Sequence, residues 1–168
     1  LQAAGVPLYS LDRFLEVRSF DVWGFNTAHE LHYTNLLYAL ELAGIPLLRR
    51  ERGAHDPFII TGGTAVSNPL PIFDFMDGVF MGDGEEAILE IMELIGQGKA
   101  LGKTRAEILA DLQTVEGLVL PEFYQVEAAP APRTFPRYIG KKIQKRNFTG
   151  KAYADLEHIL VPSVQIIQ

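Results

Sequence analysis

Short runs of apolar residues alternate, over the first hundred residues, with segments whose apolar residues recur every three to four positions. The runs at 5–9, 20–25, 57–61 and 78–81 are rich in β-branched and aromatic residues, and they predict four strands. Because these runs are continuous and do not alternate cleanly with polar residues, they are typical of parallel strands covered on both faces.

The intervening segments predict helices. The buried face of the first would be formed by Tyr33, Leu36, Leu37, Leu40 and Ala43. Gly44 suits the left-handed position after this helix, and Pro46 prevents its continuation. The second helix starts near Glu85, and we expect Gly96 and Gly98 to end it. Its buried face would be formed by Ala87, Ile88, Ile91, Leu94 and Ile95.

Strands that alternate with helices at this spacing indicate an open α/β sheet. Right-handed crossovers then bring the loops at 26–29, 61–64 and 82–85 to one edge, where the ligands of such sheets bind. We predict that this edge binds a cofactor or substrate through backbone amides and carboxylates. The residues expected there are Gly62, Gly63, Thr64, Gly82, Asp83, Gly84 and Glu85.

The loop at 82–86 has two glycines of a dinucleotide-binding G-x-G-x-x-G pattern, with Ala87 in the third position. However, Asp83, Glu85 and Glu86 already occupy the helix N-terminus at which a phosphate would bind. The loop is therefore better suited to accept hydrogen bonds from hydroxyls or amides. The alternative is a tight turn whose acidic residues stabilise the helix, with Gly84 as its strained position.

Histidine spacing does not indicate a metal centre. His29 and His32 are three residues apart, whereas a zinc-protease helix places its two histidines four apart. We favour polar residues near the sheet edge over metal ligands, and we expect His55 and His158 to be exposed.

Beyond residue 100 the pattern changes. Thr104 and Glu107 form a capping-box sequence ahead of another amphipathic helix. Two short apolar runs at 117–120 and 123–126 predict strands of a small hairpin-like unit, and the proline-rich stretch 128–136 predicts an extended linker.

Charge is distributed unevenly along the 168 residues. The chain has 21 acidic and 15 basic residues and a net charge of -6, yet segment 128–154 contains seven basic residues and no acidic one. Its basic residues include Lys141, Lys142, Lys145 and Arg146, which could contact nucleic-acid phosphates. The alternative, which we favour because no nucleic-acid module is recognisable, is that this segment docks on the acidic body of its own chain.

Composition excludes several classes of chemistry. The 48% apolar content is enough for a sizeable core, and the absence of cysteine excludes disulfides, cysteine nucleophiles and thiolate-held iron–sulfur clusters within this chain. No apolar run approaches the roughly 18–20 residues of a membrane span, and no signal-peptide pattern opens the chain. We therefore expect a cytoplasmic location and no membrane partner. The chain starts at Leu1 and stops at Gln168 within an apolar run, from which we expect a fragment of a longer protein.

Several motifs occur in an order that resembles a known protein family. A strand ending in Gly-Gly at 58–63, an aspartate-initiated strand at 77–80 and the Gly-acid-Gly-Glu loop at 82–86 look like the N-terminal B12-binding-type domain of radical S-adenosylmethionine (SAM) proteins. The stretches 20–25, 30–35 and 42–47 narrow the resemblance to one uncharacterised subfamily. The tail 161–168 is similar to the segment just ahead of that family's cluster-binding C-x-x-x-C-x-x-C loop.

The resemblance implies a partial doubly wound, mostly parallel Rossmann or flavodoxin-like sheet of the cobalamin-binding-domain type, whose first strand would precede residue 1. It implies three segments: a Rossmann-like domain at 1–100, a helix with short strands at 101–127, and a basic linker at 128–168 that leads to an absent radical SAM barrel. The implied role is an accessory one. The [4Fe-4S] cluster and SAM would belong to the downstream domain, and this fragment would not itself be catalytic.

Alternatives stay open for the ligand, the partners and the function of this chain. The D-x-H-x-x-G motif of many cobalamin domains is absent, so cobalamin is one candidate ligand and not an implied one. The expected partners are the downstream domain and, because a missing central strand would leave edges unpaired, a second copy that exchanges a strand with residues 20–25 or the chain's own tail at 163–167. The alternative function is a binding module that uses basic segment 133–151 for RNA or a ribosome-associated partner.

Overall fold

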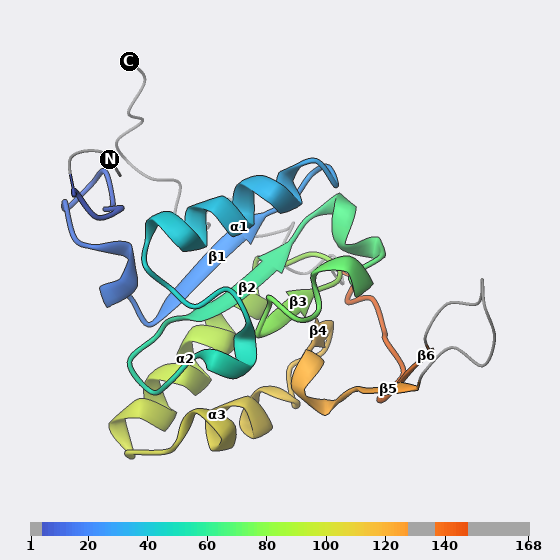
Figure 1. Ribbon diagram of the computed structural model, residues 1–168. Helices are drawn as coiled ribbons and strands as arrows, with labels where there is room; N and C mark the ends of the chain where they lie inside the picture. The colour runs from blue at the N-terminus through green and yellow to red at the C-terminus, as the bar shows by residue number, and fades with distance from the viewer. Residues whose placement is uncertain (1–4, 128–136, 148–168) are drawn as a thin grey trace, which may run out of the picture.

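The computed structural model describes residues 5–127 and 137–147. In these ranges the chain forms an open four-stranded sheet with helices on both faces (Figure 1). The strands are β1 (Val22–Asn26), β2 (Phe58–Gly62), β3 (Gly78–Phe80) and β4 (Leu118–Val119), side by side in that order. Strands β1 to β3 are parallel and β4 is antiparallel to β3, which confirms the predicted α/β class with a mostly parallel sheet.

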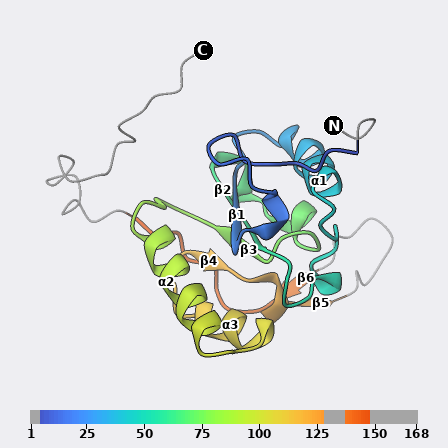
Figure 2. The same ribbon diagram turned by 90° about the vertical axis from the view of Figure 1, so that its left-hand side faces the viewer.

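Three helices cover the sheet: α1 (His32–Leu42), α2 (Ala87–Ala100) and α3 (Arg105–Leu112). Helix α1 lies on one face, and α2 and α3 lie together on the other, as the view turned by 90° shows (Figure 2). A separate two-stranded ribbon pairs β5 (Gln125–Glu127) with β6 (Arg137–Ile139). No helix in the described ranges is long and apolar enough to cross a membrane.

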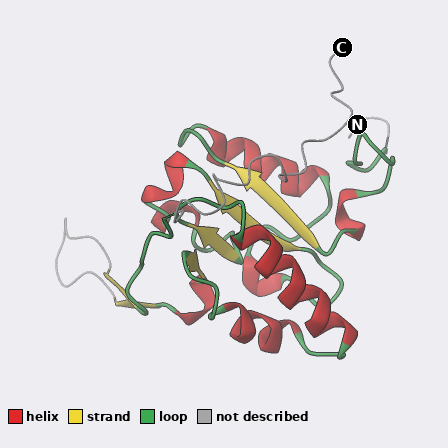
Figure 3. Cartoon of the chain, turned by 180° about the vertical axis from the view of Figure 1, so that it is seen from behind, coloured by secondary structure: helices red, strands yellow, loops and turns green. Residues whose placement is uncertain are grey.

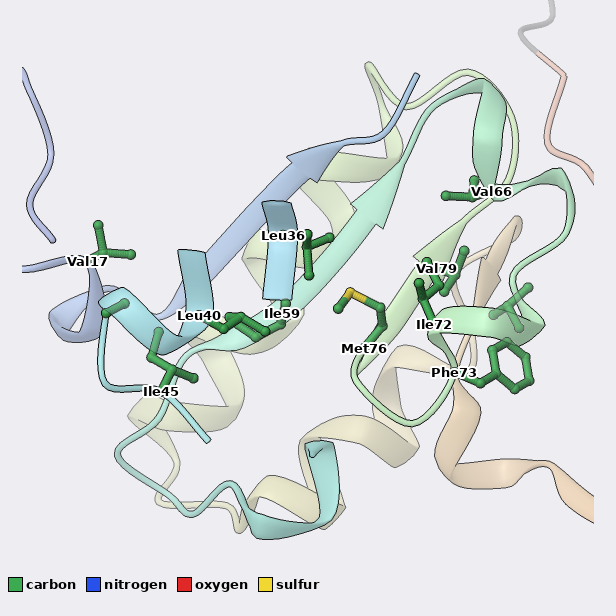
Figure 4. Packing of buried hydrophobic residues seen from close by; sticks show 12 residues of the cluster. Val17, Leu36, Leu40, Ile45, Ile59, Val66, Ile72, Phe73, Met76 and Val79 are labelled. Carbon is green, nitrogen blue, oxygen red and sulfur yellow. The ribbon is translucent and has the colours of Figure 1, made fainter. Parts of the chain in front are cut away.

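Alternate residues of the central strands point into two cores. On the α1 face, Leu36 and Leu40 pack toward Ile59 of β2 (Figure 4). The other face is turned toward the viewer in Figure 3, and on it Phe58 and Ile60 of the same strand pack under α2 and α3. Because both faces of β2 are buried, its continuous apolar run follows directly from its central place in the sheet.

The predicted strand at 5–9 is wrong. In this segment the chain makes a turn and loop, and its only strand-like contact is an isolated bridge between Tyr9 and Glu16. The apolar run stays outside the sheet, although Leu8 packs against the core on the α1 face.

The predicted end of α2 is also wrong, whereas that of α1 is confirmed. Gly44 adopts a left-handed φ of 64° directly after α1. Helix α2 instead runs through Gly96 and Gly98 to Ala100, and its left-handed residue is Gly102, at φ 69°. Gly98 is required by packing: a Cβ at this position would lie 2.6 Å from Cγ1 of Ile108, so the glycine lets α2 and α3 approach closely.

The segment after residue 100 contributes to the main sheet. The capping box is confirmed, because Thr104 accepts a hydrogen bond from the backbone of Glu107, whose carboxylate in turn accepts one from the backbone of Thr104. The predicted hairpin-like unit is wrong, since β4 pairs with β3 while β5 pairs with β6. The linker at 128–136 and the tail at 163–167 lie outside the described residues.

A buried ion network fixes the amino ends of the strands. Asp77, which precedes β3, accepts hydrogen bonds from the backbone of Ile59 at 2.8 Å and from Arg52 at 2.9 Å, and it pairs with Arg105 at 2.8 Å. The side chain of Arg52 is fully buried and that of Asp77 is 3% exposed. Arg105 also stacks over the ring of Phe58 at 4.1 Å. One carboxylate thus joins two strands, a loop and a helix.

We expect Asp77→Ala to lower the free energy of unfolding by about 3–5 kcal/mol, because it leaves two buried guanidinium groups without their carboxylate. Urea denaturation followed by circular dichroism measures this loss. The matched control is Asp12→Ala, since Asp12 is an exposed carboxylate and its replacement should leave the free energy of unfolding nearly unchanged. Equal losses in the two variants would show that the network does not stabilise the fold.

Candidate functional site

The loops that follow β1 and β2 are joined at the carboxyl edge of the sheet. The hydroxyls of Thr27 and Thr61 are 2.6 Å apart and buried. The backbone N–H of Ala65 donates to the carbonyl of Thr27 at 3.0 Å, and the hydroxyl of Thr64 donates to the carbonyl of Ala28 at 2.8 Å. The second loop is thereby held in a fixed position above the first.

Gly63 is the residue that permits this approach. Its φ is 106°, and a Cβ there would lie 2.5 Å from Oδ1 of Asn26 and 2.7 Å from the carbonyl oxygen of Thr27. Any side chain would therefore both strain the backbone and displace the β1 loop. The requirement for glycine at this position comes from packing between two loops of the same chain.

A cavity of about 470 Å³ opens beside these loops. Its lining consists of Gly63, Thr64, Val66, Ser67, Met81, Gly82, Asp83 and Lys145. The structure thus brings together four of the seven residues predicted for this edge, Gly63, Thr64, Gly82 and Asp83. The other three, Gly62, Gly84 and Glu85, do not line the cavity. Backbone, hydroxyl, carboxylate and ammonium groups at one opening are suited to a small polar ligand.

The basic segment of the chain closes one side of this edge. Arg146 forms a parallel bridge with Gly82: its N–H donates to the carbonyl of Met81 at 3.0 Å, and its carbonyl accepts from Asp83 at 3.2 Å. Gly82 has a φ of 126°, and a Cβ there would lie 2.0 Å from the carbonyl oxygen of Arg146. The main chain of residue 146 therefore packs directly against the first glycine of the Gly-Asp-Gly loop.

The side chain of Arg146 reinforces this contact. It makes two hydrogen bonds with Glu90 of α2, at 2.7 and 2.9 Å, and lies 3.5 Å from Glu86. The hydrogen bond from Arg146 holds the pKa of Glu90 below its usual range. Lys141 also donates to the carbonyl of Gln113 at 3.2 Å. In the described part of the basic segment, these contacts agree with docking on the acidic body of the same chain.

The expectation that Gly84 is the strained glycine is wrong. Its φ lies outside the left-handed region, and a Cβ there would make ordinary contacts of 3.7 Å with the ring of Phe80. The strained position is Gly82, two residues earlier. Spacing alone does not distinguish the two glycines, because the difference arises from the distant segment that docks on one of them.

Histidines do not form a metal centre in the described residues, where no group of three or more potential ligands is close enough to hold an ion. The rings of His29, on the loop after β1, and of His32, the first residue of α1, meet edge to face at 5.7 Å, and both residues are exposed. His55 is exposed as predicted, and His158 lies outside the described residues.

Two polar residues of the cavity were missed from sequence. Ser67, whose hydroxyl donates to the carbonyl of Thr64 at 3.0 Å, belongs to a 3-10 helix that no apolar period marks. Lys145 was assigned to a separate basic patch. The one signal that could have placed it here is charge complementarity between the basic segment and the acidic start of α2.

Comparison with known families identifies the chain. A family model described as "Radical SAM proteins, N-terminal" matches residues 1–121. The chain belongs to this family. Comparisons with curated proteins and with solved structures found no match.

Membership in the radical SAM N-terminal family raises the question of whether an iron–sulfur cluster fits this chain. It does not, because the 168 residues include no cysteine to supply thiolates. The chain therefore contributes no ligand of the kind such a cluster needs.

We expect Gly82→Ala to lower the free energy of unfolding by about 2–3 kcal/mol, because it combines backbone strain with a clash against residue 146. The control Gly84→Ala should cost less than about 1 kcal/mol, since its added methyl group meets no close neighbour. Urea melts of both variants provide the comparison. The docking of residue 146 on Gly82 would be contradicted if Gly84→Ala were the more damaging change.

The Arg146–Glu90 contact should also be visible in a titration. Because the folded-state pKa of Glu90 is lowered, the contact contributes stability above the ordinary pKa of about 4.3 and loses it as the pH falls through the lowered value. We expect Arg146→Ala to return the pKa of Glu90 toward its ordinary value, as measured by NMR of the side-chain carboxyl carbon. An unchanged pKa of Glu90 in this variant would rule out the contact.

Proposed function

We propose that this chain is the accessory N-terminal part of a radical SAM protein and binds a small cofactor or substrate at the carboxyl edge of its sheet. The observation that carries the proposal is the cavity of about 470 Å³ at the ends of β2 and β3, in a chain of the radical SAM N-terminal family. Ligands of open α/β sheets bind in this position. The chemistry of the family, reductive cleavage of SAM at a [4Fe-4S] cluster, would belong to a downstream domain.

The nature of the cavity supports a binding role. Thr64 and Ser67 place hydroxyl groups on its wall, and both already donate to carbonyls, so their oxygens are left to accept. Lys145 is exposed and has no partner among the described residues, so its ammonium is available to a ligand. These groups can orient a ligand, and none is placed to act as a nucleophile with its base.

Cobalamin is one candidate ligand, because the chain resembles a B12-binding-type domain, although the D-x-H-x-x-G motif of many cobalamin domains is absent. A partial Rossmann-like sheet with an open carboxyl edge is the kind of scaffold on which such a cofactor rests. The described residues offer backbone and side-chain groups at this edge, and we derive no reaction step from a cobalt centre. Of the candidate ligands, hydroxocobalamin is the most direct to test because its visible spectrum responds to its surroundings.

We expect hydroxocobalamin to bind the chain with a shift in its visible spectrum, and we expect Ser67→Phe to weaken binding at least about tenfold by filling the cavity. The matched control is Thr34→Phe. Thr34 also donates from its hydroxyl to the carbonyl three residues earlier, but on the exposed surface of α1. Spectral titration of the three proteins decides the matter.

Two outcomes would contradict this proposal in different ways. No spectral shift with the unmodified chain would exclude cobalamin as the ligand. A shift that Ser67→Phe and Thr34→Phe affect equally would show that the cavity is not the binding site.

RNA binding is the alternative role for the basic segment. The contacts of Arg146 and Lys141 with the chain itself favour the accessory role, because these groups are already used. Binding to RNA with a steep dependence on salt, lost in a variant with Lys141, Lys142, Lys145 and Arg146 replaced by alanine, would favour the alternative.

We also propose a homodimer formed through the outer edge of β1. Among the described residues β1 pairs only with β2, so its other edge presents free backbone groups. We expect light scattering to show a dimer at micromolar concentrations, and the same result for a chain that ends at residue 160 if a second copy supplies the edge. A monomer at every concentration would refute the dimer.

A further inference from the structure

A second cavity lies at the opposite, amino end of the strands. Its volume is about 210 Å³, and four arginines contribute to its wall. The lining consists of Arg49, Arg50, Arg52, Asp77, Arg105, Ala106, Leu109 and Glu122. Arg49 and Arg50 belong to the 3-10 helix η3 (Arg49–Glu51), and Arg105 begins α3. Basic side chains thus reach this cavity from both sides of the sheet's amino edge.

The charges around this cavity do not balance. Arg52 and Arg105 share the single carboxylate of Asp77, and Arg49 pairs with Glu122. Arg50 has no partner among the described residues. Four positive groups therefore face two negative ones at this cavity.

The buried carboxylate of Asp56 does not correct this imbalance. Asp56 is buried, but its side chain binds Arg18 at 2.9 Å and the backbone N–H of Gly53 at 2.9 Å. Burial is the main cause that lowers the pKa of Arg52; the carboxylate of Asp77 opposes this shift, and the charge of Arg105 adds to it.

The donors of the four arginines are used to different extents. Arg52 uses four of its five N–H donors, because besides Asp77 it donates to the carbonyls of Pro46, Leu47 and Phe75. By contrast, the Nε–H groups of Arg49 and Arg105 are buried and find no acceptor among the described residues. Arg50 is exposed with its whole guanidinium free. Arg52 therefore contributes positive potential, and Arg50 is the group best able to contact a ligand.

We propose that this cavity binds a phosphate-type oxyanion, either inorganic phosphate or the phosphate group of a small monoester. Guanidinium groups match phosphate oxygens in hydrogen-bond geometry and stay charged at every physiological pH. A tetrahedral anion accepts hydrogen bonds from several directions, whereas a planar carboxylate accepts them largely in one plane. Arginines from two elements, η3 and α3, therefore suit the tetrahedral ion better. This site is separate from the carboxyl-edge cavity and does not depend on the function proposed for it.

The test is calorimetric titration of the full chain with inorganic phosphate at constant ionic strength. We expect saturable binding at one site. Arg50→Ala should weaken this binding by about five- to tenfold, because it removes the unpartnered cation, and it should leave the fold intact. The matched control is Arg13→Ala, which removes an exposed arginine remote from the cavity and should leave affinity within about twofold.

A third variant distinguishes an anion site from a merely structural cluster. Glu122→Gln removes the carboxylate that competes for Arg49 and should strengthen phosphate binding several-fold, whereas a structural role predicts no gain. Adenosine monophosphate and acetate complete the series. Tighter binding of the nucleotide would assign the site to a monoester, and equal binding would assign it to the phosphate group alone.

Three results would overturn the proposal. These are the absence of saturable phosphate binding, equal effects of Arg50→Ala and Arg13→Ala, and acetate binding as tight as that of phosphate. Urea melts of each variant confirm that changes in affinity do not come from unfolding.

Discussion

The carboxylate of Asp77 is the constraint on which the arrangement of the sheet depends. It holds the backbone of β2 through Ile59 and binds Arg52 from the loop after α1 and Arg105 from α3. A buried carboxylate with two guanidinium partners leaves little freedom, because moving any one element would leave a charge buried without its partner. The amino ends of the central strands are therefore fixed.

Glycines in this protein mark places where one segment must approach another. Gly63 admits the loop after β1, Gly82 admits the main chain of Arg146, and Gly98 admits Ile108. Two of these three stand in motifs that resemble ligand-binding sequences. The atoms that approach these glycines nevertheless belong to the chain itself. A glycine-rich loop at a sheet edge is therefore not sufficient evidence of a ligand contact. The cavity between Gly63 and Gly82 owes its shape to these internal approaches.

Sequence patterns predicted the parts of the fold that local rules control. Continuous apolar runs predicted strands β1 to β3, and apolar residues recurring every three to four positions predicted helix α1. Thr104 and Glu107 predicted the cap of α3. Prediction failed where distant contacts override local preference. Glycine costs a helix roughly 1 kcal/mol relative to alanine, which suggested an end at Gly96 or Gly98, but the contact of Gly98 with Ile108 outweighs that cost. The place of Lys145 in the site and the backbone strain at Gly82 could not be predicted, because both depend on a pairing between residues 64 positions apart.

Because Arg146 docks on Gly82, the carboxyl-edge cavity is completed during synthesis only after the strands of the sheet. All four strands of the main sheet lie before residue 120, and domains of this kind begin to fold as soon as their strands have left the ribosome. At that moment the carbonyl of Met81 and the N–H of Asp83 still lack their partner in residue 146. The sheet is therefore complete while its carboxyl edge is unfinished. For that interval the nascent chain presents a short unpaired edge next to an acidic helix start.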